Sequence, residues 1–184
     1  QAQLDAMDVL AALVREVRRE GGTVVTGRRV VTAPLSGPLA VELDDGTRVE
    51  AANVVLATGI PVLDRGLYFA KVEPQRSYAL AFRHPQPPEL MLLTAGSPTR
   101  SVRDAPSQDG PLLLIGGEGH TVGRADSPRR HLDALRAWTQ EWFPEATETH
   151  AWSAQDYSSH DGLPAVGALP RGRGHIYLAT GYGK

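Results

Sequence analysis

Residues 152–167 read WSAQDYSSHDGLPAVG, and this stretch carries the clearest indication of the fold class. Its first half continues the alternating pattern of a β-strand over 151–157, and its second half is a turn rich in glycine and proline. A further strand pattern, HIYLATGYGK at 175–184, follows with no helix between the two. Helices and strands are therefore mixed without the regular alternation that is typical of a parallel α/β fold.

Two amphipathic helices are predicted away from this stretch. The first covers residues 1–20, whose apolar side chains recur at helical spacing before Gly21–Gly22 ends it. The second is capped by Ser127, begins with Pro128 and is ended by Pro144. We therefore expect one long helix at each side of a sheet.

Short strand patterns fill the rest of the chain. The pair Asp45–Gly46 indicates a hairpin between two of them, and HPQPPE at 84–89 indicates a turn. GGEGHTVG at 116–123 also predicts a turn, one that needs positive backbone angles. We predict an α+β fold, with a mixed, largely antiparallel sheet and flanking helices, as a single domain over 1–184. Strands are expected at 23–27, 28–34, 38–43, 47–51, 53–59, 76–82, 90–95 and 112–115.

The bulk composition narrows the class of protein. The 184 residues are 41% hydrophobic and 22% charged, with a formal net charge of -2, and no apolar run is long enough to cross a bilayer. Neither nucleic acid nor a membrane is an expected partner, because the chain lacks a basic footprint. The absence of cysteine excludes disulfides, thiolate nucleophiles and cysteine-ligated metals from this stretch. A soluble protein of the cytoplasm is the expectation.

Few residues carry an obvious chemistry. The glycines of 116–123 invite comparison with the phosphate-binding loop of a nicotinamide-dependent dehydrogenase, but 125–128 separates them from the helix that such a loop must open. His120 has two interpretations, a contact to substrate or an internally satisfied polar side chain. The six histidines lack the spacing of a zinc site, and SSHD at 158–161 lacks the setting of a nucleophile. We therefore predict no metal and name no catalytic residue.

Four motifs together resemble the D-amino-acid-oxidase-like flavoproteins, the group of glycine oxidase, sarcosine oxidase and related amine dehydrogenases. The opening helix with GGTVVTGRRVV resembles the segment that reaches the adenine, and NVVLATG resembles the strand that returns to the dinucleotide domain. WSAQDYSSHDGLPAVG matches a tryptophan strand followed by an Asp-Gly-x-Pro-x-x-Gly turn beside the flavin, and HIYLATGYGK resembles the segment that passes the flavin ring. The resemblance implies FAD contacts from Val30, Val31, Ala57, Thr58, Gly59, Gly181, Tyr182 and Gly183.

The resemblance also implies a function. Such enzymes transfer a hydride from an amine-bearing carbon to the flavin, so we expect the substrate-binding part of an FAD-dependent oxidoreductase that acts on an amine or amino acid. The family's N-terminal GxGxxG unit and C-terminal FAD segment are missing from 1–184, and they are the expected partners of this stretch. Without them, the isolated chain is expected neither to hold FAD nor to turn over. SVRDAP, LLLIGGEGH and SAQDYS look like a bacterial subgroup often followed by a Rieske iron–sulfur domain, which would be a further partner.

Substrate contacts follow from the resemblance as well. In amino-acid-oxidising members the tryptophan strand carries an arginine that pairs with the substrate carboxylate, and here that position is Asp156. Asp156 would repel a carboxylate, and it would either attract an ammonium group or pair with an internal arginine. A noncatalytic binding domain that kept the fold and lost the flavin is the alternative function. The expected substrate-facing residues are Arg76, Tyr78, Arg103, His120 and Asp156, each with a purely structural role as its alternative.

Overall fold

The computed structural model describes residues 4–33, 38–63, 66–124 and 127–183, and it divides into two compact units. The first unit consists of Gln1–Asp5 and Pro74–Gln155, and the second of Ala6–Glu73 and Asp156–Lys184. Each unit has its own cluster of buried apolar side chains. The expectation of a single domain stays a prediction, because two compact units can belong to one domain.

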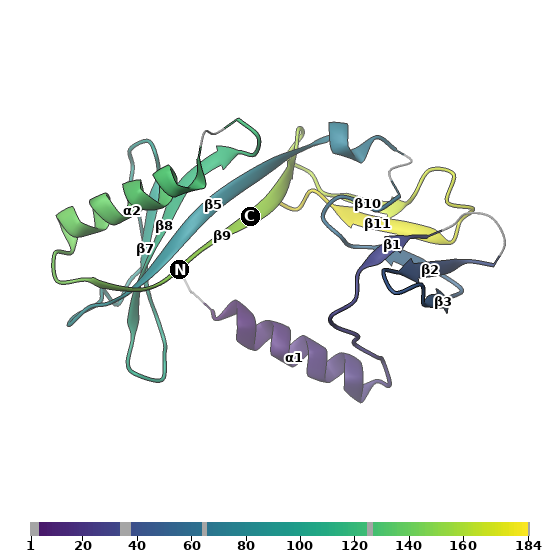
Figure 1. The fold of residues 1–184 in the computed structure, drawn as a ribbon, viewed down its shortest axis with the longest axis horizontal. Coiled ribbons are helices and arrows are strands. Elements are labelled where there is room, and N and C mark those ends of the chain that lie inside the picture. The colour runs from purple at the N-terminus through teal and green to yellow at the C-terminus, as the bar shows by residue number, and fades with distance from the viewer. Residues whose placement is uncertain (1–3, 34–37, 64–65, 125–126, 184) are drawn as a thin grey trace. The chain divides into compact units, whose positions relative to one another are not determined.

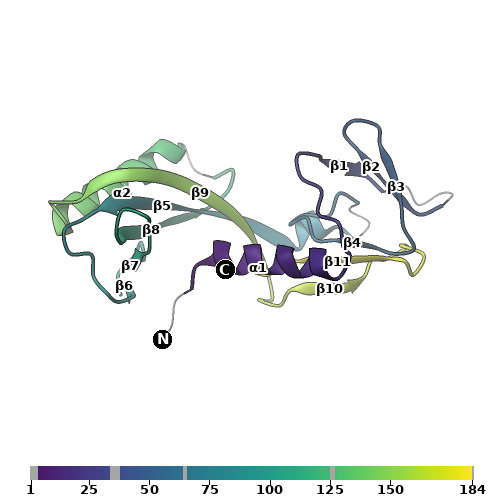
Figure 2. The ribbon, with the colours of Figure 1, turned by 90° about the horizontal axis from the view of Figure 1, so that it is seen from below.

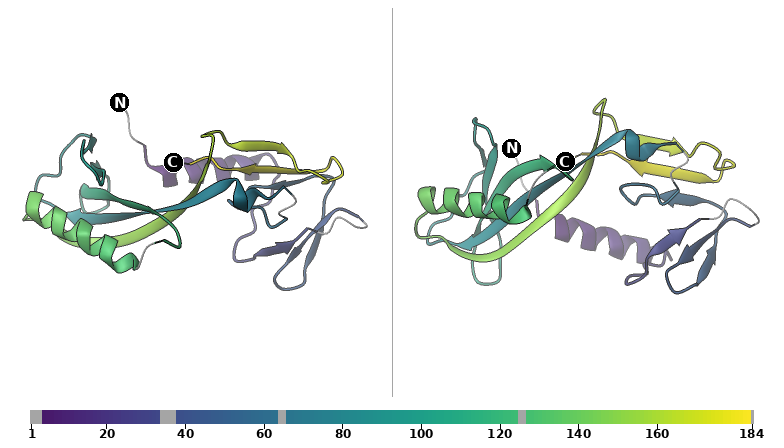
Figure 3. Two further views of the ribbon diagram at one scale, coloured as in Figure 1. Left: turned by 90° about the horizontal axis from the view of Figure 1, so that it is seen from above. Right: turned by 45° about the horizontal axis from the view of Figure 1, so that its top comes forward.

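The first unit is built on a five-stranded sheet with the strand order β6-β7-β8-β5-β9 (Figures 1 and 2). The neighbouring pairs β6–β7, β7–β8 and β8–β5 are antiparallel. Helix α2, Pro128–Trp142, lies along one face of this sheet (Figure 3) and begins where the Ser127 hydroxyl accepts the Arg129 N–H. The strands are β5 Val72–Arg83, β6 Leu92–Leu93, β7 Arg100–Ala105, β8 Leu112–Thr121 and β9 Thr147–Ser159.

The core of the first unit lies between the sheet and α2. Alternate residues of β5 point toward the helix, so Tyr78, Leu80 and Phe82 are buried there. Leu135 of α2 belongs to the same cluster and is 0% exposed. Complete burial of such a side chain is worth about 1.5–3 kcal/mol, so this cluster fixes α2 on the sheet. Val102, Leu113 and Ile115 complete the cluster.

A β-bulge interrupts β8 near its end. Tyr78 pairs with Gly117, and Arg76 pairs with His120. The two paired positions are three residues apart on β8 but only two apart on β5, so β8 contains one extra residue. Gly117 and Glu118 both have positive φ angles, 153° and 55°. A Cβ on Gly117 would lie 2.8 Å from a backbone carbonyl oxygen, so only glycine fits there without a shift. After the bulge, the alternation of side chains along β8 is shifted by one residue. Side chains that would point away from α2 in a regular strand therefore point toward it.

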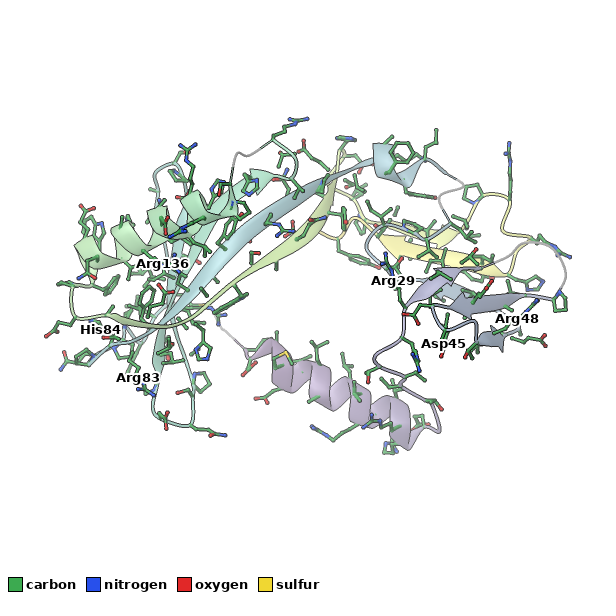
Figure 4. The ribbon with its side chains drawn as sticks, in the orientation of Figure 1. Arg29, Asp45, Arg48, Arg83, His84 and Arg136 are labelled. Atoms are coloured by element: carbon green, nitrogen blue, oxygen red, sulfur yellow. The ribbon has the colours of Figure 1, made fainter. Side chains whose placement is uncertain are left out.

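The second unit contains two three-stranded sheets, helix α1 (Ala6–Arg19) and the short 3-10 helix η1 (Tyr68–Ala70). In one sheet β1, β2 and β3 are antiparallel, and Asp45 stabilises the β2–β3 turn by accepting the Thr47 N–H at 2.9 Å (Figure 4). In the other, the order is β10-β11-β4, with β11 antiparallel to β10 and parallel to β4 (Figure 2). The strands are β1 Val30–Thr32, β2 Ala40–Leu43, β3 Arg48–Glu50, β4 Val54–Leu56, β10 Ala165–Ala168 and β11 Ile176–Thr180.

The predicted fold class is confirmed, since both predicted helices are present together with mostly antiparallel strands. Two segments were assigned wrongly by the sequence pattern. Residues 23–27 form no strand, because Val25 is 67% exposed and Gly27 turns the chain at a φ of 74°. Residues 116–123 lie mostly in β8, where the bulge and not a turn uses the positive backbone angles. The parts of predicted elements at 1–3, 34 and 184 lie outside the described residues.

Neither β7 nor β10 is predicted from the sequence, because both are short and lack a continuous apolar pattern. Helix α1 is amphipathic as predicted, yet none of its residues is buried. No helix in the described part of the chain is both long enough and apolar enough to span a membrane.

Candidate functional site

The ends of two parallel strands meet at one edge of the β10-β11-β4 sheet. Leu56 of β4 is paired with Leu178 of β11, so the segments that follow both strands leave the sheet at the same edge. The Thr180 hydroxyl donates a hydrogen bond to the Gly59 carbonyl oxygen and ties the two segments together. The structure thus brings together two of the predicted FAD-contacting groups, 57–59 and 181–183.

Glycine is required at this edge for conformational and steric reasons. Gly59 and Gly181 have φ angles of 77° and 75°, a region that side chains other than glycine rarely adopt. A Cβ on Gly59 would lie 2.8 Å from Cε2 of Tyr157, and the Gly183 N–H donates to the Tyr157 carbonyl oxygen at 3.0 Å. The backbone at the strand ends is consequently closely packed, with the Tyr157 ring against Gly59. Glycines at the ends of parallel strands are typical of sites where a cofactor approaches main-chain atoms.

The turn that follows β9 lines a pocket in the same unit. The Leu163 N–H donates to the Asp161 carboxylate at 3.0 Å, and this bond lowers the pKa of Asp161. The pocket has a volume of about 460 Å³ and includes Lys71 and Tyr68, with the Lys71 ammonium group 4.8 Å from the centre of the Tyr68 ring. The His160 N–H donates to the Lys71 carbonyl oxygen at 3.4 Å, which joins the two sides of the pocket.

Lys71 and Tyr68 were not predicted as site residues. The only signal for them in the sequence is the aromatic and cationic run LYFAKVEP, which has no distinctive spacing. Predicted contacts Val30 and Val31 lie on β1 in the other sheet of this unit, where the Val31 side chain is 48% exposed. No described contact joins them to the glycines of the strand ends. Their adenine contact stays a prediction.

In the first unit, Tyr78 and His120 are partners of one another. The Tyr78 hydroxyl lies 3.0 Å from His120 Nε2, and His120 Nδ1 lies 3.1 Å from the Thr121 carbonyl oxygen. Since the carbonyl can only accept, Nδ1 carries the proton and Nε2 accepts from the tyrosine. Tyr78 is 2% exposed. The structure therefore assigns both residues a satisfied internal role, and their predicted contact with substrate stays a prediction.

These two residues belong to a larger α2 polar cluster, which consists of Tyr78, Arg100, Glu118, His120 and His131. The rings of His120 and His131 are stacked with centroids 4.2 Å apart and an interplanar angle of 13°. His131 Nδ1 lies 3.3 Å from one oxygen of Glu118, and Arg100 forms an ion pair with the other oxygen at 2.5 Å. The Arg100 and Glu118 side chains are only 11% and 12% exposed. The sequence indicates nothing of this network, because its members come from four separate elements.

The bulge in β8 makes the α2 polar cluster. Before it, Leu113 and Ile115 point toward α2, and alternation would next place Gly117 and residue 119 there. After it, Glu118 and His120 instead reach His131 on the helix. A pocket of about 390 Å³ adjoins this cluster and is lined by Glu118, His120, Arg124, Ser127, Arg130 and His131. Residues 125 and 126 of the intervening loop lie outside the described residues.

Two further predicted residues lie on β5 and β9. The Arg76 guanidinium donates to Ser153 Oγ at 3.4 Å and to Gln155 Oε1 at 3.2 Å, so it is held by polar groups and not by an acid. Asp156 follows Gln155 on β9 and is half-buried. The proposed attraction of an ammonium group to Asp156 stays a prediction.

The last predicted residue, Arg103, lies on the other face of the five-stranded sheet. Its neighbour Val102 is buried against the α2 side, so Arg103 and Ser101 point away from α2. Both contribute to a pocket of about 390 Å³ that is also lined by Met91, Leu92, Leu93 and Val102. Among the described residues, no cluster of three or more histidines and acids is arranged to hold a metal ion.

Comparison with known proteins identifies the family. A family model described as FAD dependent oxidoreductase (DAO) matches residues 1–184. A curated relative, the "Putative Rieske 2Fe-2S iron-sulfur protein YhfW" of Bacillus subtilis (strain 168), is 25% identical over 186 residues. That match covers 100% of this chain and 36% of the relative, so the chain spans about a third of its length.

Solved structures show the same fold. Glycine oxidase from Geobacillus kaustophilus is similar with a TM-score of 0.76 at 21% identity, over 98% of this chain and 50% of that one. L-proline dehydrogenase from P. horikoshii gives a TM-score of 0.70 at 16% identity, over 96% and 50% of the two chains. A modified fructosyl peptide oxidase from Aspergillus nidulans gives 0.73 at 15% identity, over 98% and 50%. The chain spans half the length of these three proteins.

Proposed function

We propose, from the premise that this chain belongs to the DAO family of FAD-dependent oxidoreductases, that the full-length protein oxidises the C–N bond of an amine or amino acid. The observation that supports this best is the meeting of glycine-containing segments at the common edge of β4 and β11. Bound FAD would accept the hydride that leaves the amine-bearing carbon. The chain's own task is to hold the cofactor and to present the substrate.

The second unit supplies the surface for the cofactor in this proposal. Gly59 and Gly181 provide the positive φ angles of the two segments that leave the strands, and the Thr180 hydroxyl joins these segments by its hydrogen bond to the Gly59 carbonyl oxygen. Lys71 and Asp161 place one cation and one anion at the adjoining pocket, where they would orient polar groups of the cofactor. FAD would thus lie against β4, β11 and the turn after β9, in agreement with the contacts predicted at 57–59 and 181–183.

The substrate class is inferred from the names of the structural neighbours. Glycine oxidase, L-proline dehydrogenase and fructosyl peptide oxidase are named after substrates that contain an amine. Asp156 would attract the ammonium form of such a substrate. The relative named as a Rieske protein supports a linked iron–sulfur domain as the electron acceptor. The cytoplasm is the proposed location.

The visible absorption spectrum of the purified full-length protein tests the proposal. We expect a flavin band that is bleached under anaerobic conditions by one class among glycine, L-proline and a fructosyl amine. A folded protein that takes up no FAD would support a noncatalytic binding domain instead. Bleaching by none of the amines, with FAD bound, would contradict the proposed C–N oxidation.

A matched pair of variants tests the proposed position of the cofactor. Gly59→Ala puts a Cβ 2.8 Å from the Tyr157 ring at a φ of 77°, so FAD affinity should fall by about tenfold or more. Gly96→Ala is the control, because a Cβ there meets no atom within 4 Å. Fluorescence titration of FAD measures both. Equal FAD affinities for the two variants would contradict the placement of the cofactor at this edge.

A further inference from the structure

A pocket of about 390 Å³ lies in the first unit where β8 ends and α2 begins (Figure 1). Its wall includes Glu118, whose φ angle of 55° is unusual for a residue other than glycine. The Glu118 side chain is also only 12% exposed. Strained backbone angles tend to occur where a protein binds a ligand or reacts. Both features single out this pocket as a candidate binding site.

The lining of the pocket is positive because its acid is neutralised from behind. Arg100, which does not line the pocket, forms an ion pair with Glu118 at 2.5 Å. His131 Nδ1 also lies 3.3 Å from the Glu118 carboxylate. Among the described residues that line the pocket, the other permanently charged ones are Arg124 and Arg130. These two guanidinium groups determine the potential in the pocket, and they favour an anionic ligand.

The two arginines come from different elements. Arg124 follows β8 in a turn in which its N–H donates to the Thr121 carbonyl oxygen at 3.3 Å, whereas Arg130 lies in the first turn of α2. Each guanidinium has five N–H donors, so it can donate to a ligand in addition to its contacts within the protein. The Ser127 hydroxyl accepts the Arg129 N–H at 3.3 Å and keeps its own proton for a further acceptor. Donors thus reach the pocket from three positions.

We propose that this pocket binds the phosphate group of a small phosphate monoester through Arg124, Arg130 and Ser127. Such a group carries nearly two negative charges at neutral pH and has three acceptor oxygens, which match two cations and a hydroxyl at separate positions. A carboxylate carries a single charge and would use only part of this set. The volume of about 390 Å³ is near the lower end of the usual range for small-molecule sites, about 300–1,000 Å³, and this favours a small metabolite.

This site goes beyond the proposed function, because it belongs to the first unit and the glycine-containing edge proposed for FAD belongs to the second. A bound phosphate would join the turn after β8 to the first turn of α2, so the ligand would stabilise the first unit. The proposed oxidation requires neither Arg124 nor Arg130. Failure of that oxidation would leave the phosphate site in place, and loss of the phosphate site would leave the oxidation in place.

Calorimetric titration of the full-length protein in the presence of saturating FAD tests the inference. Inorganic phosphate and glycerol 3-phosphate should each bind at least about tenfold more tightly than acetate at equal ionic strength. Glycerol, which lacks the phosphate group, should not bind. Equal affinities for phosphate and acetate would show only a general attraction of anions to arginine and would overturn the inference. Absence of phosphate binding while FAD is saturating would overturn it as well.

A matched pair of variants at Ser127 assigns the binding to this pocket. Asparagine and aspartate are both good N-cap residues, so Ser127→Asn and Ser127→Asp should keep α2 capped and unfold at similar urea concentrations. The two variants differ by one negative charge at the pocket. Ser127→Asp should therefore bind phosphate at least about tenfold more weakly than Ser127→Asn. Equal phosphate affinities for the pair would refute the inference.

Neutral replacement of the arginines gives a second measurement. Arg124→Gln and Arg130→Gln should each lower the affinity for phosphate by about fivefold, because each removes one exposed cation from the pocket. Arg83→Gln is the control, because Arg83 belongs to the same unit but pairs with Asp109 and does not line the pocket. Its phosphate affinity should equal that of the unaltered protein. A loss of the same size in all three variants would contradict binding at this pocket.

Discussion

Replacement of Glu118 by glutamine should destabilise the first unit by about 3 kcal/mol. The Arg100 and Glu118 side chains are 11% and 12% exposed, and removal of one member of such a buried pair typically costs about 3–5 kcal/mol. Glutamine has nearly the same volume and keeps one acceptor, which favours the lower end of this range. Arg100 Nε is already buried without a hydrogen-bond partner, so without Glu118 the guanidinium keeps only its hydrogen bond to the Pro98 carbonyl oxygen at 2.8 Å and its contact with the Trp138 ring.

Tryptophan fluorescence reports on this unit alone. All three tryptophans, Trp138, Trp142 and Trp152, lie within Pro74–Gln155, and the Arg100 guanidinium is 5.8 Å from the Trp138 ring. With a urea m-value of about 1.5 kcal/mol/M, a loss of about 3 kcal/mol moves the unfolding midpoint by about 2 M. The double variant Arg100→Leu/Glu118→Gln should lose less stability than the two single losses combined, because neither charge is then left alone.

An exposed glutamate on the same unit provides the control. Glu145→Gln changes the same functional group outside the α2 polar cluster, and its effect should stay within about 0.5 kcal/mol. The reasoning would be refuted if Glu118→Gln and Glu145→Gln unfolded at the same urea concentration. Strict additivity in the double variant would likewise show that the two side chains do not stabilise one another.

Two further predictions concern the same unit. The Arg136 guanidinium donates to both oxygens of Glu148 at 2.7 and 2.8 Å and lowers the pKa of that carboxyl group. The pair therefore stabilises the folded state at pH values above the ordinary carboxyl pKa. This stabilisation is lost as the pH falls through the lowered pKa. The Arg136 and Glu148 side chains are 39% and 31% exposed, so Glu148→Gln should lower the free energy of unfolding in urea by about 0.5 kcal/mol at pH 7 and leave it unchanged near pH 2. A difference in stability that does not depend on pH would contradict this assignment. Gly117→Ala should cost more than about 1.5 kcal/mol, because the new Cβ would lie 2.8 Å from the Thr99 carbonyl oxygen, and unchanged thermal unfolding would show that the bulge can relax.

Local patterns in the sequence predicted most elements of the fold. The Ser127–Pro128 start of α2 was predictable because a capping hydroxyl and a proline act within one turn of helix. The Asp45–Gly46 turn was predictable for the same reason, since its hydrogen bond spans two residues. Strands β7 and β10 were not, because their pairing partners, and not their own composition, hold them in place.

The candidate cofactor edge could be predicted only through the resemblance. The segments 57–59 and 181–183 lie far apart in the sequence, and parallel pairing of β4 with β11 brings them together. Nothing in the periodicity of either segment specifies that pairing. Lys71 and Tyr68 were missed because their relevance depends on the turn at 159–165, which is remote in sequence.

The α2 polar cluster was out of reach of sequence patterns for a different reason. Side-chain alternation along β8 assigns Glu118 and His120 to the face away from α2 as long as the strand is regular. One extra residue reverses that assignment, and its presence shows only in the register with β5. Glycine-rich sequence at 116–123 signalled positive backbone angles correctly, but a turn and a bulge use such angles equally well.

The predicted substrate residues differ in whether their polar groups already have hydrogen-bond partners within the protein. A buried polar group that already has its hydrogen bonds loses them if it turns to a ligand, so ligand binding must first replace what is broken. Tyr78 and His120 are in this position, because the Tyr78 hydroxyl and His120 Nε2 form a hydrogen bond of 3.0 Å beneath α2. Arg103 is in a different position, because it is only half-buried and lies on the face of the sheet away from α2. Substitution of Tyr78 is therefore expected to destabilise the fold more than substitution of Arg103.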